Sequence, residues 1–299
     1  MDMLRIPPSV SRRWYDELGV VAASGVLNRE SILESALIAK RHLCGLDELI
    51  GTLKYGRGYI EVGNLPIDQS LPSPPADGLR PKGKSFISEL LLTGMTELLE
   101  LHPFSFREEK DGALVHEICP VPALSGSVSS NGRVGFDFHT DGAYLPRHLR
   151  PHSLSLLCLM DAAGVGTHIA PVSEAVALLD DESIEQLMGK NFFHVSPETF
   201  KVEHQGDFSS VLDRVDGVYE LKAALHSTQA LAPRAQAALV ALSLALKRVQ
   251  RVKKWQPAEL LIFSNLRCVH GRGEVRGKRW LQRCYGSYNQ PTGSVISLN

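Results

Sequence analysis

The sequence predicts a mainly β protein, a jelly roll interrupted by helical insertions. Short strand-like runs bounded by glycine and proline dominate residues 113–162, a pattern typical of β sandwiches and barrels. A length of 299 residues fits one domain, because β folds with insertions often reach this size undivided. We therefore expect a single domain over residues 1–299. Residues 1–57 would form a helical support, and residues 58–288 would form the jelly-roll core.

Three stretches have helical periodicity. Ser31 opens the first, and Glu34 follows three residues later, which predicts a capping box. The second, residues 86–99, has a broad apolar face. The third, residues 233–252, begins with proline, and its apolar residues fall on one face at helical spacing.

A strand is expected near residues 59–62, and the chain then loses regular patterning. Residues 66–83 hold five prolines and must form a loop. Two interpretations of this loop stay open, a plain surface connection and a lid over an active site.

The segment before Gly142 carries the most informative pattern in the chain. His139 and Asp141 are separated by one residue, and alternation along a strand places both side chains on one side. The same alternation predicts that Phe136 and Phe138 project to the other side. Two ligands at such spacing can reach one metal ion, and a third must come from another strand.

His270 is the candidate third ligand. It follows a buried strand-like run at residues 259–264 and is separated by more than a hundred residues from His139. Two imidazoles and one carboxylate form the ligand set that holds non-haem Fe(II) on one face and leaves the other face open. The sequence therefore predicts an iron site made of His139, Asp141 and His270.

A further strand-like run, at residues 279–286, carries two arginines. Arg279, Leu281 and Arg283 fall on one face by period-two alternation. Inward-facing guanidinium groups are costly unless each meets an anion. A dicarboxylate cosubstrate would satisfy one of them through two parallel hydrogen bonds.

In these motifs the chain resembles the clavaminate synthase-like branch of the taurine dioxygenase superfamily. Members of that superfamily are Fe(II)- and 2-oxoglutarate-dependent oxygenases. The resemblance runs in order from about Gly58 to Tyr288. One departure is Asp141, which stands where many amino-acid hydroxylases of the branch carry glutamate. The segments that carry the resemblance are Gly58-Tyr-Ile-Glu-Val-Gly-Asn-Leu-Pro-Ile-Asp, Leu114-Val-His-Glu-Ile-Cys-Pro-Val-Pro, Phe136-Asp-Phe-His-Thr-Asp, His152-Ser-Leu-Ser-Leu-Leu-Cys-Leu-Met, Val269-His-Gly-Arg and Arg279-Trp-Leu-Gln-Arg.

The resemblance implies roles for residues outside the metal site. Arg279 would hold the far carboxylate of 2-oxoglutarate, with the Thr167 hydroxyl beside it. Arg283 would meet a carboxylate of the substrate. Asp216, with Asp213 in reserve, lies where the branch's amino-acid hydroxylases place acidic substrate contacts. An ordinary Asp-Gly turn explains Asp216 as well.

These observations predict an oxygenase that uses Fe(II), 2-oxoglutarate and O2 to hydroxylate a small polar substrate, most simply a free L-amino acid or a derivative. One alternative is desaturation, or oxidation of an intermediate tethered to a carrier protein. A different class also stays open, a non-catalytic jelly roll that binds a small acid, because a fold does not prove a function.

Composition excludes several classes of function. A formal net charge of −1 gives no electrostatic basis for binding nucleic acid or an anionic membrane. The basic run at residues 247–254 closes an amphipathic helix, where cations favour the helix dipole. Five scattered cysteines without a C-x-x-C pattern fit reduced thiols in the cytoplasm. No signal pattern or membrane-spanning run is expected.

Other polar residues have a weaker pattern. His116, His168 and His204 show no paired spacing, so we expect surface or hydrogen-bonded core positions for them. Residues 129–133, just before the metal strand, predict either a flexible turn or a loop that contacts the substrate.

Overall fold

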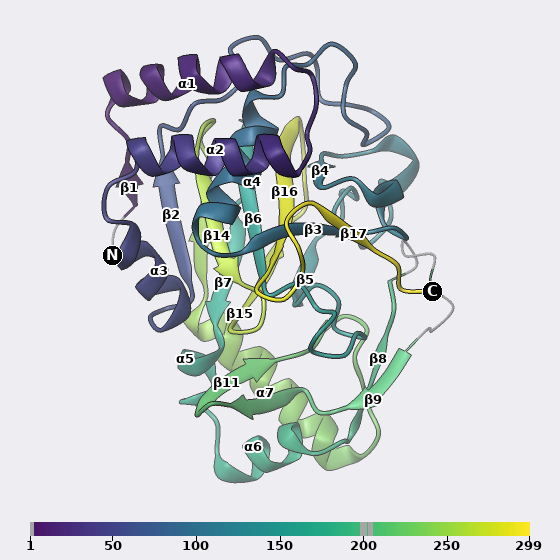
Figure 1. The fold of residues 1–299 in the computed structure, drawn as a ribbon. Helices are drawn as coiled ribbons and strands as arrows, with labels where there is room; N and C mark the ends of the chain where they lie inside the picture. The colour runs from purple at the N-terminus through teal and green to yellow at the C-terminus, as the bar shows by residue number, and fades with distance from the viewer. Residues whose placement is uncertain (1–2, 198–201, 203–205) are drawn as a thin grey trace.

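A computed structural model describes residues 3–197, 202 and 206–299. Its larger sheet has the strand order β1-β2-β14-β6-β16-β3-β17, and β4 also pairs with β16 (Figure 1). The pairs are antiparallel except for β1 with β2 and β17 with β3. The strands of this sheet are β1 (Leu4–Arg5), β2 (Tyr59–Gly63), β3 (His102–Phe106), β4 (Val115–Ile118), β6 (Ser153–Asp161), β14 (Leu260–Ser264), β16 (Arg279–Ser287) and β17 (Ser294–Ile296).

A second antiparallel sheet has the order β13-β7-β15-β5. Side chains from both sheets form one buried cluster, with Leu154 and Phe263 from the larger sheet and Ile169 and Cys268 from the smaller one. Two mainly antiparallel sheets that enclose a common core confirm the predicted jelly roll with helical insertions. The strands of the second sheet are β5 (Phe136–His139), β7 (Thr167–Pro171), β13 (Arg251–Lys253) and β15 (Cys268–Arg272).

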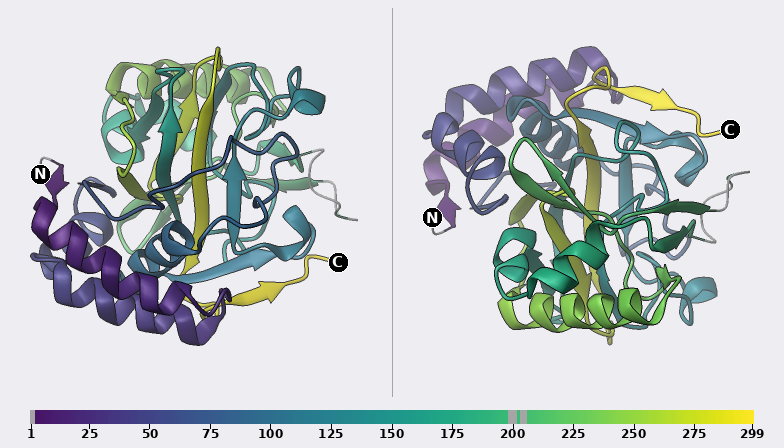
Figure 2. Two further views of the ribbon diagram at one scale, coloured as in Figure 1. Left: turned by 90° about the horizontal axis from the view of Figure 1, so that it is seen from above. Right: turned by 90° about the horizontal axis from the view of Figure 1, so that it is seen from below.

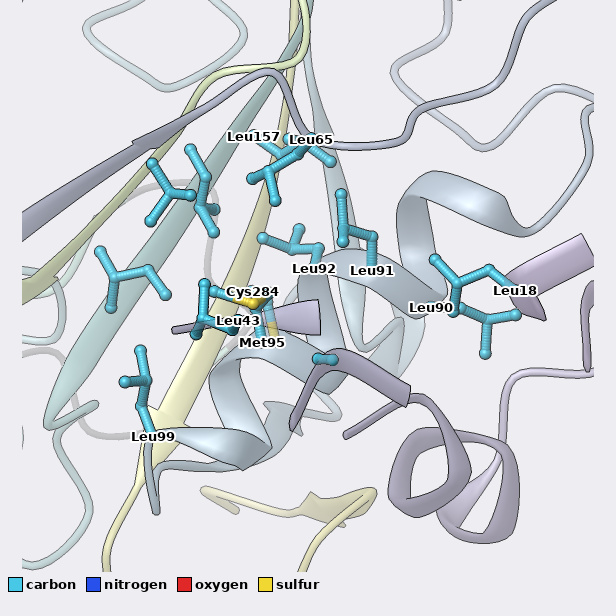
Figure 3. Packing of buried hydrophobic residues seen from close by; sticks show 14 of the residues in the cluster. Leu18, Leu43, Leu65, Leu90, Leu91, Leu92, Met95, Leu99, Leu157 and Cys284 are labelled. Carbon is cyan, nitrogen blue, oxygen red and sulfur yellow. The ribbon is translucent and has the colours of Figure 1, made fainter. Parts of the chain in front are cut away.

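Four helices cover the outer face of the larger sheet, as Figures 1 and 2 show. Alternate residues of its strands, such as Leu157 and Cys284, point away from the inner core and pack against helix residues such as Leu92 and Met95 (Figure 3). Leu92 is fully buried there, so its replacement by alanine would cost about 2–5 kcal/mol of stability. The helices are α1 (Pro8–Ala22), α2 (Arg29–His42), α3 (Leu46–Lys54) and α4 (Ile87–Leu98).

The start of α2 corrects one expectation. The helix begins at Arg29, and its N-cap is Asn28 rather than Ser31. The Asn28 side chain accepts a hydrogen bond from the Ser31 backbone N–H, and the Ser31 hydroxyl accepts one from the Asn28 N–H. Ser31 is therefore the third helical residue, N3, and completes the capping box at a position that glutamate or glutamine usually occupies.

A second group of elements lies between β7 and β13 in the sequence and packs around its own apolar cluster. The predicted helix at 233–252 is present as Pro233–Val249, and Leu239, Leu242 and Leu246 are buried on its inner face. None of the described helices is both long and apolar enough to cross a bilayer. The elements of this group are α5 (Val172–Val176), α6 (Asp181–Met188), α7 (Pro233–Val249), β8 (Phe192–Val195), β9 (Gly206–Ser209), β10 (Leu212–Val215), β11 (Val218–Leu221) and β12 (Gln229–Ala230).

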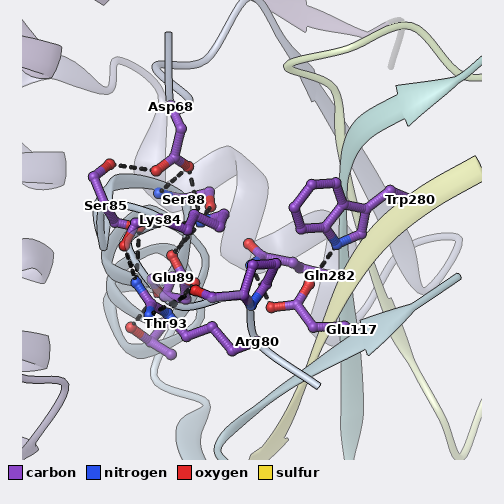
Figure 4. Close-up of polar contacts among 11 residues, drawn as sticks. Asp68, Arg80, Lys84, Ser85, Ser88, Glu89, Thr93, Glu117, Trp280 and Gln282 are labelled. Carbon is purple, nitrogen blue, oxygen red and sulfur yellow. Dashed lines mark hydrogen bonds and ion pairs between the residues drawn. The ribbon is translucent and has the colours of Figure 1, made fainter. Parts of the chain in front are cut away.

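The proline-rich loop at residues 66–83 is fastened by a buried polar network (Figure 4). The Lys84 ammonium lies 3.0 Å from the Asp68 carboxylate and 2.7 Å from that of Glu89, and Arg80 donates to Glu89 at 2.8 Å. Residues of this loop line neither of the two cavities described below. The arrangement favours a plain connection over an active-site lid for residues 66–83.

Candidate metal centre and substrate cavity

The three predicted ligand residues meet at one end of the smaller sheet. His139 is the last residue of β5 and pairs in register with His270 of β15, while Asp141 follows two residues beyond the strand. Asp141 Oδ1 lies 3.4 Å from Nε2 of His139 and 3.5 Å from Nε2 of His270. The ligand atoms of the three residues all lie within 4.8 Å of one another. Antiparallel pairing of β5 with β15 is thus what joins residues so distant in sequence.

Hydrogen bonds fix the His139 ring and the loop that carries Asp141. His139 Nδ1 lies 2.9 Å from the carbonyl oxygen of Asp137, which can only accept, so Nδ1 carries the proton and Nε2 keeps its lone pair. Histidine ligands of metals commonly donate their other N–H in this way. The buried Asn265 side chain accepts from the Asp141 N–H at 2.8 Å and donates to the Asp141 carbonyl at 2.9 Å. The loop that carries the carboxylate is therefore held at both backbone groups.

The electrostatics suit a divalent cation. Burial alone would raise the pKa of Asp141, but the Arg283 guanidinium at 2.8 Å and hydrogen bonding hold that pKa well below its usual range. Burial, with His139 close by, lowers the pKa of His270 to about 3. An ionised carboxylate and neutral imidazoles are the protonation states that metal binding requires. The Tyr285 hydroxyl donates to Asp141 Oδ2 at 3.0 Å, which leaves Oδ1 facing the histidines.

Strand alternation fails at one position. Phe138 is buried on the side away from the ligands, as expected, but Phe136 stacks on the His139 ring with a centroid distance of 3.8 Å. The cause is a β-bulge between two residue pairs, His139 with His270 and Phe136 with Arg272. From one pair to the other, β5 advances by three residues and β15 by only two. The extra residue rotates Phe136 to the metal side.

Arg279 and Thr167 lie together at the inner end of a cavity that reaches the metal site. The Arg279 guanidinium donates to the Thr167 hydroxyl at 3.1 Å, and Trp255 donates to the same hydroxyl at 2.9 Å. Burial lowers the pKa of Arg279, and its Nε has no partner among the described residues. Arg279, Leu281 and Arg283 all line this cavity together with His139 and His270, as the alternation along residues 279–286 predicts.

Arg272 holds the loop that precedes β5. Its guanidinium donates to the carbonyls of Ser129, Gly132, Val134 and Gly273 at 2.7–3.1 Å. Burial lowers the Arg272 pKa to about 10, so the group stays charged at neutral pH. Of the two interpretations of residues 129–133, the structure favours the contacting loop, since Ser129 and Ser130 line the larger cavity.

Arg283 is surrounded by polar groups of the protein. One terminal nitrogen donates to Asp141 and, at 3.4 Å, to Ser130; the other donates to Glu109 and to His116 Nδ1. Burial opposes its charge, but the nearby carboxylates raise the Arg283 pKa. Four of its five N–H donors are thus engaged, and only the buried Nε lacks a partner among the residues that the structure describes. The assignment of Arg283 to a substrate carboxylate stays a prediction.

Glu109 and His116 belong to this site, although no sequence pattern singled out Glu109. His116 is buried and hydrogen-bonded, as expected, and burial lowers its pKa to about 4. One carboxylate oxygen of Glu109, Oε2, is buried without a hydrogen-bond partner among the described residues. The only signal in the sequence is the position of Glu109 just after the strand that ends at Phe106.

The larger cavity opens beside the triad and encloses about 460 Å³. It shares Ser130, Phe136, His139 and Arg283 with the cavity of Arg279, so the two meet at the metal site. Its other described lining residues are Glu109, Gly126, Ser127, Val128, Ser129, Thr140, Asp141, Gly142, Ala143, Tyr144, Val195, Ser196, Pro197, Ala224, His226, Ser227 and Tyr285.

Asp216 lies outside both cavities. It occupies the turn of the β10–β11 hairpin with φ 50°, is exposed, and lines neither cavity. Asp213, the reserve, accepts a hydrogen bond from Ser210 at 2.5 Å. His168 lies on β7 and is half-buried, and His204 falls outside the described residues. The geometry gives a substrate role of Asp216 no support, and that role stays a prediction.

A jelly roll with two histidines and a carboxylate at its open end, and with a buried arginine further in, defines the class of non-haem iron oxygenases that use a 2-oxo acid. The profile of the family described as taurine catabolism dioxygenase TauD, TfdA family, matches residues 91–285. The chain belongs to this family and is a 2-oxoglutarate-dependent dioxygenase that requires Fe(II) and O2.

Similar proteins agree with this assignment. The chain is 30% identical to the L-asparagine oxygenase of Streptomyces coelicolor over 240 residues, which is 76% of this chain and 70% of that one. It is 27% identical to clavaminate synthase 2 of Streptomyces clavuligerus, over 76% and 73% of the two chains. The crystal structure of asparagine oxygenase with Fe(II), 2S,3S-3-hydroxyasparagine and succinate superposes with a TM-score of 0.87 at 23% identity and covers 98% of this chain and 99% of that one.

Proposed function

We propose that the protein hydroxylates an unactivated C–H bond of a free L-amino acid or a close derivative. One molecule each of O2 and 2-oxoglutarate would be consumed, one oxygen atom would enter the C–H bond, and the other would appear in succinate as CO2 is released. The observation that carries the substrate assignment is the buried pair of opposite charges, Glu109 and Arg283, in the cavity next to the metal site.

The donor set fits Fe(II). His139 Nε2, Asp141 Oδ1 and His270 Nε2 would hold the ion, since they converge and since Asp141 is ionised and His270 neutral. When bound, iron supplies the oxidative chemistry that couples decarboxylation of 2-oxoglutarate to oxidation of a C–H bond. Arg283 and Tyr285 bind the second oxygen of Asp141 and so keep the first one directed at the histidines.

The cavity of Arg279 fits the cosubstrate. A dicarboxylate that reaches from the metal site to Arg279 would place its far carboxylate against the guanidinium and the Thr167 hydroxyl. The free Nε of Arg279 is the donor expected for such a ligand, because a buried N–H without a partner is costly. Leu154, Leu156 and Leu281 line the same cavity, so water would be excluded from the ion pair.

The pair of Glu109 and Arg283 fits the two charges that every α-amino acid carries. A substrate carboxylate would take N–H donors of Arg283 that Glu109 now occupies, together with the free Nε. Glu109 would then accept the ammonium group, for which its oxygen Oε2 already lacks a partner. One ion pair would become two, and the α-carbon end of the substrate would be fixed beside the metal site.

A substrate screen tests this proposal. Purified protein with Fe(II) and 2-oxoglutarate is given each of the common L-amino acids, and succinate is measured with and without each candidate. Mass spectrometry of the product then separates hydroxylation, a gain of one oxygen, from desaturation, a loss of two hydrogens. Substrate-stimulated succinate from none of them would overturn the proposal and favour a carrier-tethered substrate. Tight binding of an acid with no succinate at all would favour the non-catalytic alternative.

Glu109→Gln should weaken substrate binding selectively. The amide cannot pair with an ammonium group as a carboxylate does, and a hydrogen bond to a charged group contributes about 1.5–3 kcal/mol, or about 10- to 150-fold in KM. The KM for 2-oxoglutarate should stay unchanged. Glu108→Gln is the matched control, because Glu108 binds Ser297 and Leu298 and lines neither cavity. Equal changes in both KM values of the Glu109 variant would contradict the assignment.

Asp216→Asn tests the remaining substrate prediction. If Asp216 contacts the substrate, the substrate KM should rise while that for 2-oxoglutarate is nearly unchanged. Unaltered kinetics would leave Asp216 as the turn residue that its positive φ indicates.

A cytoplasmic location is proposed on the cysteines alone. All five thiols are free in the structure, as expected in a reducing compartment.

A further inference from the structure

We propose that the larger cavity selects a substrate whose side chain ends in a neutral hydrogen-bonding group, such as an amide. His226 would recognise this group by a hydrogen bond. The inference rests on the proposed amino-acid hydroxylase function. It concerns the side chain of the substrate, because Glu109 and Arg283 would recognise only the ammonium and carboxylate groups that all amino acids share.

His226 lies on a segment that is fastened to the metal strand. The Thr140 N–H donates to the carbonyl of Ala223 at 2.8 Å, and the Leu225 N–H donates to that of Phe138 at 3.0 Å. Ala224 also pairs with His139 as an isolated β-bridge. These contacts lie on both sides of His139, so the position of His226 is fixed relative to the metal site.

The His226 ring faces the cavity with its polar atoms available. It contacts Phe136 edge to face at a centroid distance of 5.2 Å and lies 6.3 Å from the His139 ring. The side chain is exposed and lines the larger cavity. Within the described part of the chain neither ring nitrogen has a hydrogen bond to the protein, so one donor and one acceptor remain for a ligand.

The charges of the described residues that line the cavity favour a neutral side chain over an ionic one. Of its described lining residues only Glu109 and Asp141 carry a carboxylate, and both are paired with Arg283. Apart from Arg283, no lysine or arginine lines it among these residues. The rest are glycine, alanine, valine, proline, aromatic or hydroxyl side chains, together with the imidazoles of His139 and His226. From the described residues, a guanidinium or carboxylate would gain no counter-charge there in return for the water it loses.

A neutral amide or ureido group would be satisfied in the same place. Its carbonyl oxygen can accept from the His226 N–H, and its N–H groups can donate to serine hydroxyls such as those of Ser196 and Ser227, which line the same cavity. The apolar residues Val195 and Pro197 would cover the methylene groups of the side chain.

Pairs of amino acids that have the same shape and differ in charge test the inference. L-Citrulline is compared with L-arginine, and L-glutamine with L-glutamate, on the Fe(II) holoenzyme with 2-oxoglutarate. Dissociation constants are measured by calorimetry without oxygen, and turnover is measured in air. The neutral member of each pair should bind at least about tenfold more tightly, because an unpaired buried charge is strongly disfavoured.

Variants at His226 assign the effect to this residue. His226→Ala should weaken binding of the neutral ligands about fivefold by removing one hydrogen bond. His226→Asp supplies the missing anion and should reverse the order, so that arginine binds more tightly than citrulline. His148→Ala is the control, since His148 is exposed and lines neither cavity. The exposed position of His226 makes loss of folding unexpected in either variant, and thermal melting checks this.

The outcomes separate the inference from the proposed function. Preferred binding and turnover of arginine or lysine by the unmodified enzyme would overturn the inference and leave amino-acid hydroxylation standing. An unchanged citrulline-to-arginine ratio in His226→Asp would likewise remove His226 as the selecting residue. No turnover of any amino acid would overturn the proposed function, and the inference with it.

Discussion

Replacing His139 or His270 by alanine should abolish Fe(II) binding and turnover while the fold persists. Each imidazole supplies one of three ligand atoms. Removal of a residue that only hydrogen-bonds to a metal ligand lowers metal affinity or activity by about 10- to 100-fold. Removal of a ligand itself should lower both by more than that. The replacements remove ring contacts, mainly that of His139 with Phe136 and that of His270 with Phe263, but no aliphatic side chain of the core. The melting temperature without metal should therefore change little.

Three measurements check this expectation. Bound iron is determined after reconstitution, succinate is followed in turnover, and thermal melting is recorded in the presence and absence of Fe(II). Fe(II) should raise the melting temperature of the unmodified protein and not that of the variants, because only a folded site binds the ion. His168→Ala is the matched control, since His168 lies on the neighbouring strand β7 and lines neither cavity. Turnover at the unmodified rate in either ligand variant would refute the site.

Spacing along strands predicted the parts of the site that depend on local geometry. His139 and Asp141 stand two residues apart at a strand end, and Arg279, Leu281 and Arg283 alternate along β16 to line one cavity. Each inference used the period of two that an extended chain imposes on its side chains. Where a bulge changes that period, as at Phe136, the same reasoning gave the wrong side.

The residues whose part in the site the sequence did not predict come from contacts between distant segments. Glu109 follows β3, His116 lies on β4, and His226 follows β11, and none has a spacing relation to the triad. They meet the site because β3 and β4 both pair with β16 and because the segment of His226 binds the metal strand. No local pattern encodes such pairings.

The surroundings of Arg283 show a related limit. Alternation placed its side chain inside, but it could not show that Glu109, His116, Asp141 and Ser130 engage four of its five donors. The chain satisfies this buried cation with its own anions before any substrate arrives. For Arg279, by contrast, the described side-chain hydrogen bond is to one hydroxyl, that of Thr167, and its Nε is left without a partner among the described residues. This difference is why the cosubstrate is assigned to Arg279.

Arg279→Ala should raise the KM for 2-oxoglutarate more than any other single change away from the metal ligands. Loss of one partner of a buried, hydrogen-bonded charge pair costs about 2–5 kcal/mol. Arg279→Lys keeps the charge but loses the planar fork, so its KM should lie between those of Arg279→Ala and the unmodified enzyme. Thr167→Val removes the hydroxyl that orients Arg279 and should cause a smaller rise.

The decisive comparison is between the two arginines of β16. Arg279 variants should change the KM for 2-oxoglutarate and leave substrate affinity, measured at saturating 2-oxoglutarate, nearly unaltered. Arg283→Lys should do the reverse and also lower kcat, because Arg283 binds the Asp141 carboxylate. Arg276→Lys is the control, since Arg276 is exposed and its ion pair among the described residues is with Glu274. If the 2-oxoglutarate defect appeared in the Arg283 variant and not in those of Arg279, the cosubstrate would lie four residues further along the strand, and the cavity lined by Arg279 would have another ligand.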